Sequence, residues 1–303
     1  MKKDVTGNKK GNIILSIVLV TYNRKNECIR CLKSIICNYD PSYELIIVDN
    51  CSNDGTEEEV KNFTENIENF KYIKLDCNYG PSYGKNIGFK NSAGKYIYFI
   101  DDDAYINNNE KVLMYLIKML DDNKEIGAIS NCIYDTLKKK RLEPTKSKNS
   151  NMILYFQGGS HIIRKEAIEG KDLYPDGFEY GSEELFASLR IYNKGYNIIE
   201  DYTYTIIHSP SKITSTSKEK RIYGYIVNRA CFKFILYPKG IRPILYLVFV
   251  LKIIKNYGLS LELLTTSMKR VRYCLRLPRY KNYRISYNTI FKMIKLFGIK
   301  NII

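Results

Sequence analysis

The chain has 303 residues, of which 45% are hydrophobic and 26% charged, a composition that excludes an intrinsically disordered protein and supports a sizeable core. Its eight cysteines include a single closely spaced pair, Cys28 and Cys31, so we expect free thiols in a reducing compartment. The apolar run over 13–20 is too short to span a bilayer and is followed by no small-residue cleavage site. We therefore expect a cytoplasmic protein.

The net charge of +16 is concentrated in the last third of the chain. Residues 212–303 contain 20 Lys or Arg against two acids, Glu219 and Glu262, whereas residues 1–211 carry a slight excess of acids. Such a change in composition is typical of a domain boundary. We predict one domain over 1–211 and a basic, mostly helical region over 212–303.

Strands and helices are predicted to alternate along the first two thirds of the chain. Continuous apolar runs indicate strands that are buried on both faces. Each run is followed by apolar residues at helical spacing, such as Ile29, Leu32 and Ile36 after the first strand. The predicted strands are 13–20, 44–49, 70–75, 96–100, 152–164 and 204–208, and a mobile loop is predicted over 136–151. This alternation favours an α/β fold with a largely parallel sheet.

Acidic side chains follow two of these strands where the apolar runs end. Asp49 ends the second strand, and Asp101, Asp102 and Asp103 end the fourth. In open α/β sheets, ligands bind beyond the carboxyl ends of the strands. Three adjacent carboxylates repel one another unless a divalent cation or a hydrogen-bonding ligand neutralises them. The alternative is an acidic turn exposed to solvent.

Four motifs in this order resemble those of the family-2 glycosyltransferases, and the resemblance covers residues 13 to about 210. They are Val20-Thr21-Tyr22-Asn23-Arg24, Ile47-Val48-Asp49-Asn50, Asn78-Tyr79-Gly80 with Asn86-Ile87-Gly88, and Phe99-Ile100-Asp101-Asp102-Asp103. The resemblance implies a GT-A fold with a mostly parallel central sheet. It also implies a nucleotide-sugar donor, with UDP- or dTDP-sugars expected, a divalent metal (Mn²⁺ or Mg²⁺), and inversion at the anomeric carbon.

The resemblance also implies roles for individual residues. Thr21 and Tyr22 would contact the nucleotide, Asp49 would hydrogen-bond the base, and Asp101 would face the ribose. The remaining residues expected to bind the donor are Asn23, Arg24, Asn50, Asn78, Gly80, Lys85, Asn86 and Asp102. Asp103 would bind the metal through its DXD-like motif, and the late histidine His208 would be a second ligand.

Two adjacent acids, Glu183 and Glu184, match the paired acids of the family, with Arg190 downstream. An acid beside the acceptor hydroxyl would remove its proton as it attacks the sugar. The family usually has Glu-Asp at these positions, so the second Glu is a departure and both acids remain candidates for the base. Alternatively, two acids at the start of a helix serve only to stabilise its dipole.

The expected activity is extension of a cell-surface glycan or a lipid-linked oligosaccharide at the cytoplasmic face of a membrane. One alternative is sugar transfer to a peptide or protein side chain, and another is a catalytically silent binding protein associated with membrane or nucleic acid. The apolar run 244–251 is too short to span a bilayer, but with its flanking basic residues it suits an anionic membrane surface. A helical cap with a solvated basic face is the simpler reading. Nucleic-acid binding is disfavoured because the chain contains no recognised module.

Overall fold

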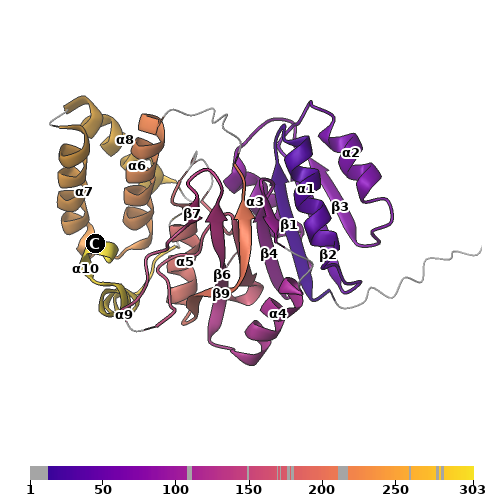
Figure 1. Cartoon of the computed structure of the whole chain (residues 1–303). Coiled ribbons are helices and arrows are strands. Elements are labelled where there is room, and N and C mark those ends of the chain that lie inside the picture. Colours follow the sequence, from indigo (N-terminus) through magenta and orange to yellow (C-terminus); the bar gives the residue numbers. More distant parts are fainter. Residues whose placement is uncertain are drawn as a thin grey trace, which may run out of the picture.

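A mixed nine-stranded sheet and a group of C-terminal helices at one end of it make up the computed structural model (Figure 1). The structure describes residues 13–107, 111–148, 150–168, 170, 172–175, 178, 181–210, 218–258, 261–277, 280 and 283–303.

The strands are β1 (Leu15–Thr21), β2 (Tyr43–Asp49), β3 (Phe70–Lys74), β4 (Tyr96–Asp101), β5 (Ala104–Ile106), β6 (Ile126–Asp135), β7 (Lys140–Arg141), β8 (Ser160–Arg164) and β9 (Asn197–His208). The α-helices are α1 (Lys25–Ile36), α2 (Thr56–Phe63), α3 (Pro81–Asn91), α4 (Val112–Asp122), α5 (Glu183–Asn193), α6 (Lys218–Leu236), α7 (Arg242–Tyr257), α8 (Leu261–Arg276), α9 (Tyr287–Phe297) and α10 (Ile299–Ile302). Lys165–Ala167 and Lys239–Ile241 form short 3₁₀ helices.

The predicted α/β class is confirmed, and the sheet is mixed. Its order is β3-β2-β1-β4-β8-β6-β9-β5, with β7 paired to β6. The four strands β3, β2, β1 and β4 are mutually parallel, as the sequence predicts. Beyond them β8 is antiparallel to both β4 and β6, while β6 and β9 are parallel. An antiparallel strand at the centre therefore divides the sheet into two halves.

Three predicted segments differ from the structure. The strand expected over 204–208 is longer and begins at Asn197 as part of β9. Of the strand expected over 152–164, only Ser160–Arg164 forms β8, while Met152 and Ile153 make isolated bridges. Within the loop expected over 136–151, β7 folds back on β6 as a hairpin arm. The local pattern misleads because β6 and β8 take their register from long-range pairing, which sequence periodicity does not report.

Apolar side chains cover both faces of the parallel strands, which explains their continuous hydrophobic runs. On one face, β1 and β2 pack with α1, α2 and α4 through residues such as Leu19, Ile47 and Leu32. On the other face they pack with α3 and α5 through residues such as Val18 and Phe89. The polar ends of the strands are left at one edge of this layered structure.

Two glycines allow α3 to lie directly on β1. A Cβ added at Gly84 would fall 2.6 Å from Cγ1 of Val20, and one added at Gly88 would fall 2.2 Å from Cγ1 of Val18. Contacts this short exclude any side chain unless the helix moves outward. The close approach places the neighbouring Lys85 and Asn86 in the interior, where both are buried.

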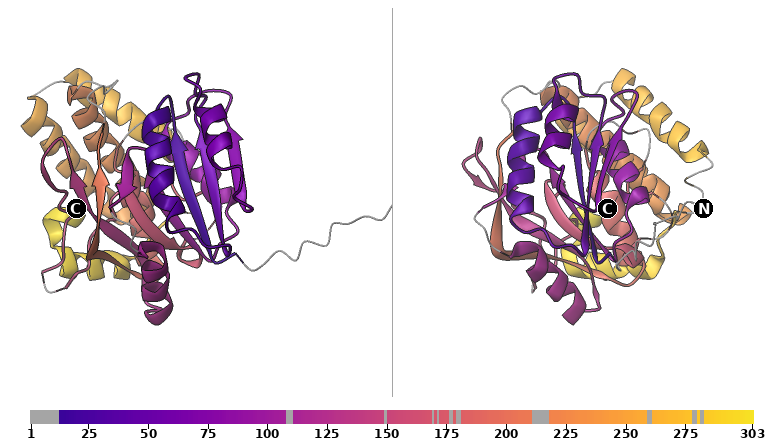
Figure 2. Two further views of the ribbon diagram at one scale, coloured as in Figure 1. Left: turned by 45° about the vertical axis from the view of Figure 1, so that its right-hand side comes forward. Right: turned by 90° about the vertical axis from the view of Figure 1, so that its right-hand side faces the viewer.

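The C-terminal helices share a hydrophobic core with the sheet. Phe232 of α6 packs edge-to-face on Phe186 of α5, with ring centroids 5.6 Å apart. The same core continues from Val18 in β1 to Phe249 in α7, and Figure 2 shows these helices gathered beside the sheet. The predicted boundary between 211 and 212 lies outside the described residues, so the division into two domains stays a prediction. Within the described part of the chain, no helix combines the length and apolar character needed to cross a membrane.

Candidate active site

The carboxyl ends of the parallel strands bring the predicted acids to one edge of the sheet. Thr21 at the end of β1 is in register with Asp49 at the end of β2, and Val20 is in register with Asp101 at the end of β4. Asp102 and Asp103 follow in the turn before β5, and both are buried. The predicted clustering of these residues follows directly from parallel pairing.

Arg24 neutralises two of the three consecutive aspartates. Its Nη1 donates to Oδ1 of Asp102 at 2.9 Å and to Oδ2 of Asp103 at 2.8 Å. Thr21 Oγ1 donates to the other oxygen of Asp102 at 2.9 Å. The Arg24 guanidinium, just after β1, and the Thr21 hydroxyl at its end therefore offset the repulsion expected between the adjacent carboxylates.

His208 lies on the far side of Asp103, because β9 pairs antiparallel with β5 and sets His208 opposite Ala104. Its Nε2 is 3.2 Å from Oδ1 of Asp103, and its Nδ1 is 3.6 Å from Oδ2 of Asp135. Burial raises the pKa of Asp102 to about 7 despite Arg24. Burial alone would also raise the pKa of Asp103, but hydrogen bonds and charge from His208 and Arg24 lower it below its usual value.

Asp103 and His208 fit a divalent cation in their chemistry. A carboxylate and an imidazole are suitable ligands for Mn²⁺, and Mg²⁺ is commonly held by one or two carboxylates together with substrate phosphates. Among the described residues, no group of three or more His, Cys, Asp or Glu side chains is placed to hold a metal without such help. Asp103 and His208 would leave most coordination positions of such a cation to other ligands.

Lys85 links the strand edge to the start of α5. Its Nζ donates to the main-chain oxygen of Gly158 at 3.0 Å and pairs with Oδ1 of Asp101 at 2.8 Å. Burial alone would lower the pKa of Lys85, but Asp101, Glu184 and Glu183 together raise it. A buried ammonium thus lies among three carboxylates that come from distant parts of the sequence.

The two acids of α5 have different environments. Glu183 is buried, and its Oε2 accepts a hydrogen bond from the Gly181 N–H at 2.9 Å. Glu184 lies over Gly158, where an added Cβ would be 2.2 Å from its Oε1. Burial and the charge of Glu183 raise the pKa of Glu184 to about 8, although Lys85 opposes them. These features favour Glu184 as a proton acceptor.

Several predicted donor-binding residues are engaged with the protein itself. The Asp49 carboxylate accepts from Ser52 N at 2.8 Å and from the Tyr72 hydroxyl at 2.7 Å, and Asp49 is fully buried. Oδ1 also accepts from the Ser52 hydroxyl at 2.5 Å, so only Oδ2 retains acceptor capacity for a base, and that contact stays a prediction. Asn23 adopts a left-handed conformation, and its Oδ1 accepts from Asn53 N at 2.8 Å.

Other predicted residues flank this edge. Asn50 Nδ2 donates to Gly80 O at 3.3 Å, and Asn78 Oδ1 accepts from Gly80 N at 2.9 Å. Gly80 has a φ of 86°, which favours glycine there. Tyr22 is 43% exposed, so its ring is accessible to a ligand.

Asn86 holds a neighbouring segment in place. Its Oδ1 accepts from the N–H groups of Leu173 and Tyr174 at 3.0 and 2.9 Å, and its Nδ2 donates to Tyr174 O at 2.9 Å. Arg190 Nη1 donates to Asp172 O at 2.7 Å in the same segment. Asn86 is therefore placed to support the site, and a direct contact with the donor stays a prediction.

The sequence predicts a bend or close approach at Gly158-Gly159, but no functional role for Gly158, Tyr174 or His161. The Gly158-Gly159 pair is itself a signal of close approach, and the structure shows that Glu184 occupies the space. His161 is fully buried, and its Nε2 is 3.2 Å from the Tyr174 hydroxyl. Burial and Lys85 hold the pKa of His161 well below its usual value, so it is a neutral core residue.

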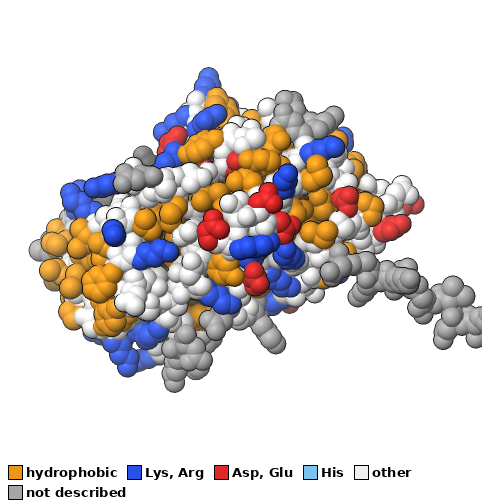
Figure 3. All heavy atoms as spheres, turned by 90° about the horizontal axis from the view of Figure 1, so that it is seen from below, with side chains coloured by type: hydrophobic (Ala, Val, Ile, Leu, Met, Phe, Trp, Pro, Cys, Tyr) orange, Lys and Arg blue, Asp and Glu red, His pale blue; other side chains and the backbone are white. Residues whose placement is uncertain are grey.

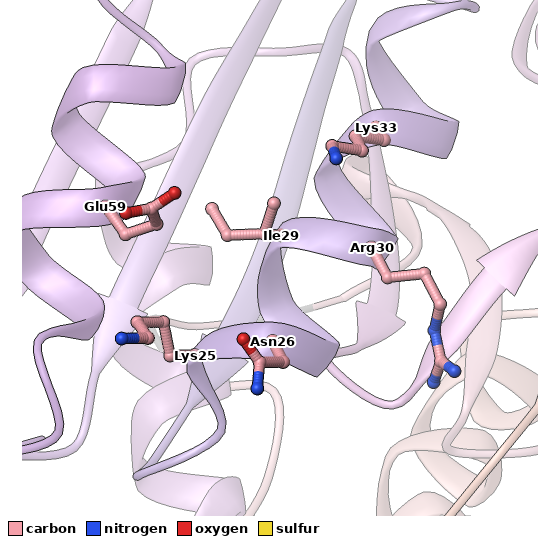
Figure 4. Close-up of a pocket in the computed structure, with 6 residues that line it drawn as sticks. All are labelled: Lys25, Asn26, Ile29, Arg30, Lys33 and Glu59. Carbon is pink, nitrogen blue, oxygen red and sulfur yellow. The ribbon is translucent and has the colours of Figure 1, made fainter.

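A separate open pocket of about 480 Å³ lies between α1 and α2 (Figure 4). Its described lining consists of Lys25, Asn26, Ile29, Arg30, Lys33 and Glu59. No acid from the strand ends lines it, and Glu59 is the one acid among its described lining residues. We therefore place the candidate active site at the sheet edge.

Comparison with known proteins identifies similar glycosyltransferases. Residues 16–176 match the family model described as glycosyl transferase family 2. The poly(ribitol-phosphate) beta-N-acetylglucosaminyltransferase TarS of Staphylococcus aureus is 24% identical over 201 residues, which cover 62% of this chain and 34% of TarS. An uncharacterised glycosyltransferase of Rickettsia conorii is 29% identical over 143 residues, which cover 46% of this chain and 22% of that protein. The chain thus spans about a fifth to a third of the length of these relatives.

Solved structures support the fold. TarS residues 1–349 in complex with UDP-GlcNAc superpose with a TM-score of 0.64 at 18% identity, covering 95% of this chain and 89% of that one. A mannosyltransferase from Pyrobaculum calidifontis in complex with GDP-Man and Mn²⁺ gives a TM-score of 0.55 at 17% identity. The match covers 87% of this chain and 76% of the mannosyltransferase chain. The fold is therefore of the GT-A type, as the resemblance implies. Since the family model matches more than half of its length, the chain belongs to glycosyl transferase family 2.

Proposed function

We propose that the protein transfers a sugar, with inversion, from a nucleotide-sugar to a hydroxyl of a cell-surface glycan or lipid-linked precursor. The observation that carries the proposal is the convergence of Asp101, Lys85 and Glu184 beside the Asp103–His208 pair. An acid with a raised pKa, a buried cation and a pair of metal-binding side chains lie together at the edge where ligands bind in such sheets.

Glu184 is the proposed general base. In the transfer, the acceptor oxygen bonds to the anomeric carbon as the bond from that carbon to the diphosphate oxygen breaks. The acceptor proton passes to Glu184, and the nucleoside diphosphate leaves. With a pKa of about 8, Glu184 is a stronger base than an ordinary Glu once it has lost the proton that it holds at neutral pH. Glu183 is held by the Gly181 N–H and is the less suitable acceptor.

Lys85 is proposed to keep Glu184 available for this step. Its positive charge opposes the effect of burial on the pKa of Glu184. Through Gly158 O and Asp101 it also fixes the relative positions of β4, the chain before β8 and α3. The same ammonium would attract the phosphates of a donor.

Asp103 and His208 are the proposed ligands of a divalent metal, which would stabilise the charge that develops on the diphosphate leaving group. Arg24 neutralises Asp102 and Asp103 in this structure. Its guanidinium would thus be available for the donor phosphates once a cation binds Asp103. Mn²⁺ in the solved complex of the mannosyltransferase supports the assignment by analogy.

The donor is proposed to be a UDP-sugar, which the UDP-GlcNAc complex of TarS supports. The test is the melting temperature of the protein with Mn²⁺ and UDP, alone and together, since a ligand that binds only the folded state raises it. We expect the melting temperature of the wild type to rise most when Mn²⁺ and UDP are both present. In Asp103→Ala the two together should raise it little. Equal rises in Asp103→Ala and wild type would contradict the assignment of the metal site.

A further inference from the structure

A second pocket, of about 200 Å³, lies between α6 and α7, outside the candidate active site. Tyr225, Arg229 and Lys233 recur at one helical turn along α6, and Ile226, Ala230 and Phe234 form the adjacent row. The α7 wall and the chain end complete the described lining with Leu245, Val248, Phe249, Lys252 and Ile303. The pocket is therefore an apolar groove with three cations in it.

The three cations are close enough to repel one another. Burial, Arg229 and Lys252 hold the pKa of Lys233 well below its usual value, and burial and Arg229 lower that of Lys252. Lys233 is 4% exposed, and its Nζ donates to the main-chain oxygen of Ile303 at 2.9 Å. That oxygen offsets at most one of three positive charges. Among the described lining residues none is acidic.

Clustered cations in an apolar groove are costly unless an anion binds them, because burial without a counter-charge is unfavourable. The anion must also have an apolar part that replaces water on Ile226, Phe234, Val248 and Phe249. A phosphate group attached to a hydrocarbon chain meets both conditions. A fully polar phosphate polymer would leave the apolar walls unfilled.

An exposed apolar face of α7 extends the groove to the surface. Ile244, Leu247 and Leu251 lie on one side of this helix and are 55%, 59% and 56% exposed. Viewed from below, hydrophobic side chains gather with Lys and Arg at the end of the molecule formed by the C-terminal helices (Figure 3). The arrangement suits a helix that rests in the headgroup region of a bilayer.

The groove also adjoins the catalytic acids. Asn228 Nδ2 of α6 donates to Gly181 O at 3.3 Å, and Gly181 N donates to Glu183. Gly181 also packs on the backbone of Tyr225, the first pocket residue of α6. Lys233 follows Tyr225 by eight positions, which correspond to about 12 Å along a helix. The Tyr225 end of the groove is therefore the end nearer to Glu183.

We propose that the α6–α7 pocket binds the phosphate group and the adjoining hydrocarbon of a membrane lipid phosphate. Arg229, Lys233 and Lys252 bind the phosphate, and the walls of α6 and α7 hold the start of the chain. The role of this lipid as the carrier of the acceptor sugar rests on the proposed function. The binding itself is independent of catalysis and can be measured separately.

The test is the melting temperature of the full chain with dihexanoyl phosphatidic acid, dihexanoyl phosphatidylcholine, inorganic phosphate and polyphosphate, each below any micelle concentration. We expect a rise with phosphatidic acid and a much smaller one with the other three. An equal rise with phosphatidylcholine would show an apolar groove with no role for phosphate. An equal rise with polyphosphate or inorganic phosphate would show a polar phosphate site. Either result, or no rise with any probe, would overturn the proposal.

Two variants on one helix provide the matched control. Lys252→Gln removes a charge from the pocket, whereas Lys255→Gln removes one from the exposed surface of α7 a turn later. We expect Lys252→Gln to weaken phosphatidic acid binding about tenfold, and Lys255→Gln by less than about twofold. Lys233→Met, which removes a buried cation, should weaken binding while raising stability without lipid. Equal losses at 252 and 255 would contradict the pocket and indicate a diffuse basic surface.

Binding must also be separable from transfer. Glu184→Gln should bind phosphatidic acid as wild type does, because Glu184 does not line the pocket. Lipid binding by a wild-type protein that transfers no sugar from any donor would refute the proposed function and leave the pocket intact. Lost lipid binding in a protein that still transfers sugar would refute the pocket alone.

Discussion

Gly158 positions the proposed base because it has no side chain. A Cβ at this residue would be 2.2 Å from Oε1 of Glu184, whereas one at Gly159 would be no closer than 3.2 Å to any neighbour, Cδ1 of Ile133. We expect Gly158→Ala to push the Glu184 carboxylate aside and lower kcat about tenfold or more, with little change in KM for the donor. Gly159→Ala should retain most activity. Steady-state kinetics compare kcat in the two variants. Equal losses of kcat would contradict the position assigned to the Glu184 carboxylate.

The raised pKa of Glu184 makes stability depend on pH. The folded state holds this proton up to a pH of about 8, whereas the unfolded chain releases it near its ordinary pKa of 4.5. The folded state therefore binds more protons between these values, and stability falls as pH rises through the window. Glu184→Gln removes the loss, so we expect it to stabilise the protein by about 1 kcal/mol or more at pH 8 and by little at pH 4.5. Denaturant unfolding at both pH values measures the free energy of unfolding of the two proteins. A stabilisation that is the same at both pH values would show that burial does not shift the pKa of Glu184.

At the scale of elements, the packing of α3 on β1 determines where Lys85 lies. Gly88 is the closest point, since a Cβ there would be 2.2 Å from Cγ1 of Val18. We expect Gly88→Ala to lower the free energy of unfolding by about 1–3 kcal/mol through overpacking. Combining it with Val18→Ala should recover part of that loss, because the smaller residue makes room. Additive losses in this double-mutant cycle would mean that the two residues do not compete for the same space.

The sequence predicts the parallel half of the fold well because its signals are local. Buried runs that end in Thr21, Asp49 and Asp101 define three strand ends, and parallel pairing brings those ends together. The other half carries no such signal, because β8 inserts between β4 and β6 in the antiparallel direction and its register depends on pairing between distant segments.

The same distinction holds for the site. Acids at strand ends are visible in the sequence, whereas the Lys85–Asp101 pair and the fit of Glu184 over Gly158 are contacts between distant segments. The Arg24 bridge to Asp102 and Asp103 spans about 80 residues of sequence and has no local pattern. Residue type and strand position therefore predict which side chains gather, but not how they pair.

At the scale of the whole molecule, the C-terminal helices complete the core against which α5 packs. Phe186 of α5 contacts Phe232 of α6 and the rings of Tyr280 and Tyr283. We expect a chain that ends at residue 210 to lose cooperative thermal unfolding and to bind a hydrophobic dye, because this face of α5 becomes exposed. A truncated chain that melts cooperatively near the wild-type temperature would instead establish residues 1–211 as an independent domain.

Turnover of nucleotide-sugars tests the central claim most directly. Wild type, Glu184→Gln and Glu183→Gln would be incubated with Mn²⁺ and a panel of nucleotide-sugars, and release of nucleoside diphosphate and sugar would be followed by mass spectrometry. We predict release from one donor class by wild type, a fall of about a hundredfold or more in Glu184→Gln, and a smaller fall in Glu183→Gln. Failure of wild type to release sugar from any donor, or unchanged release by Glu184→Gln, would contradict the account.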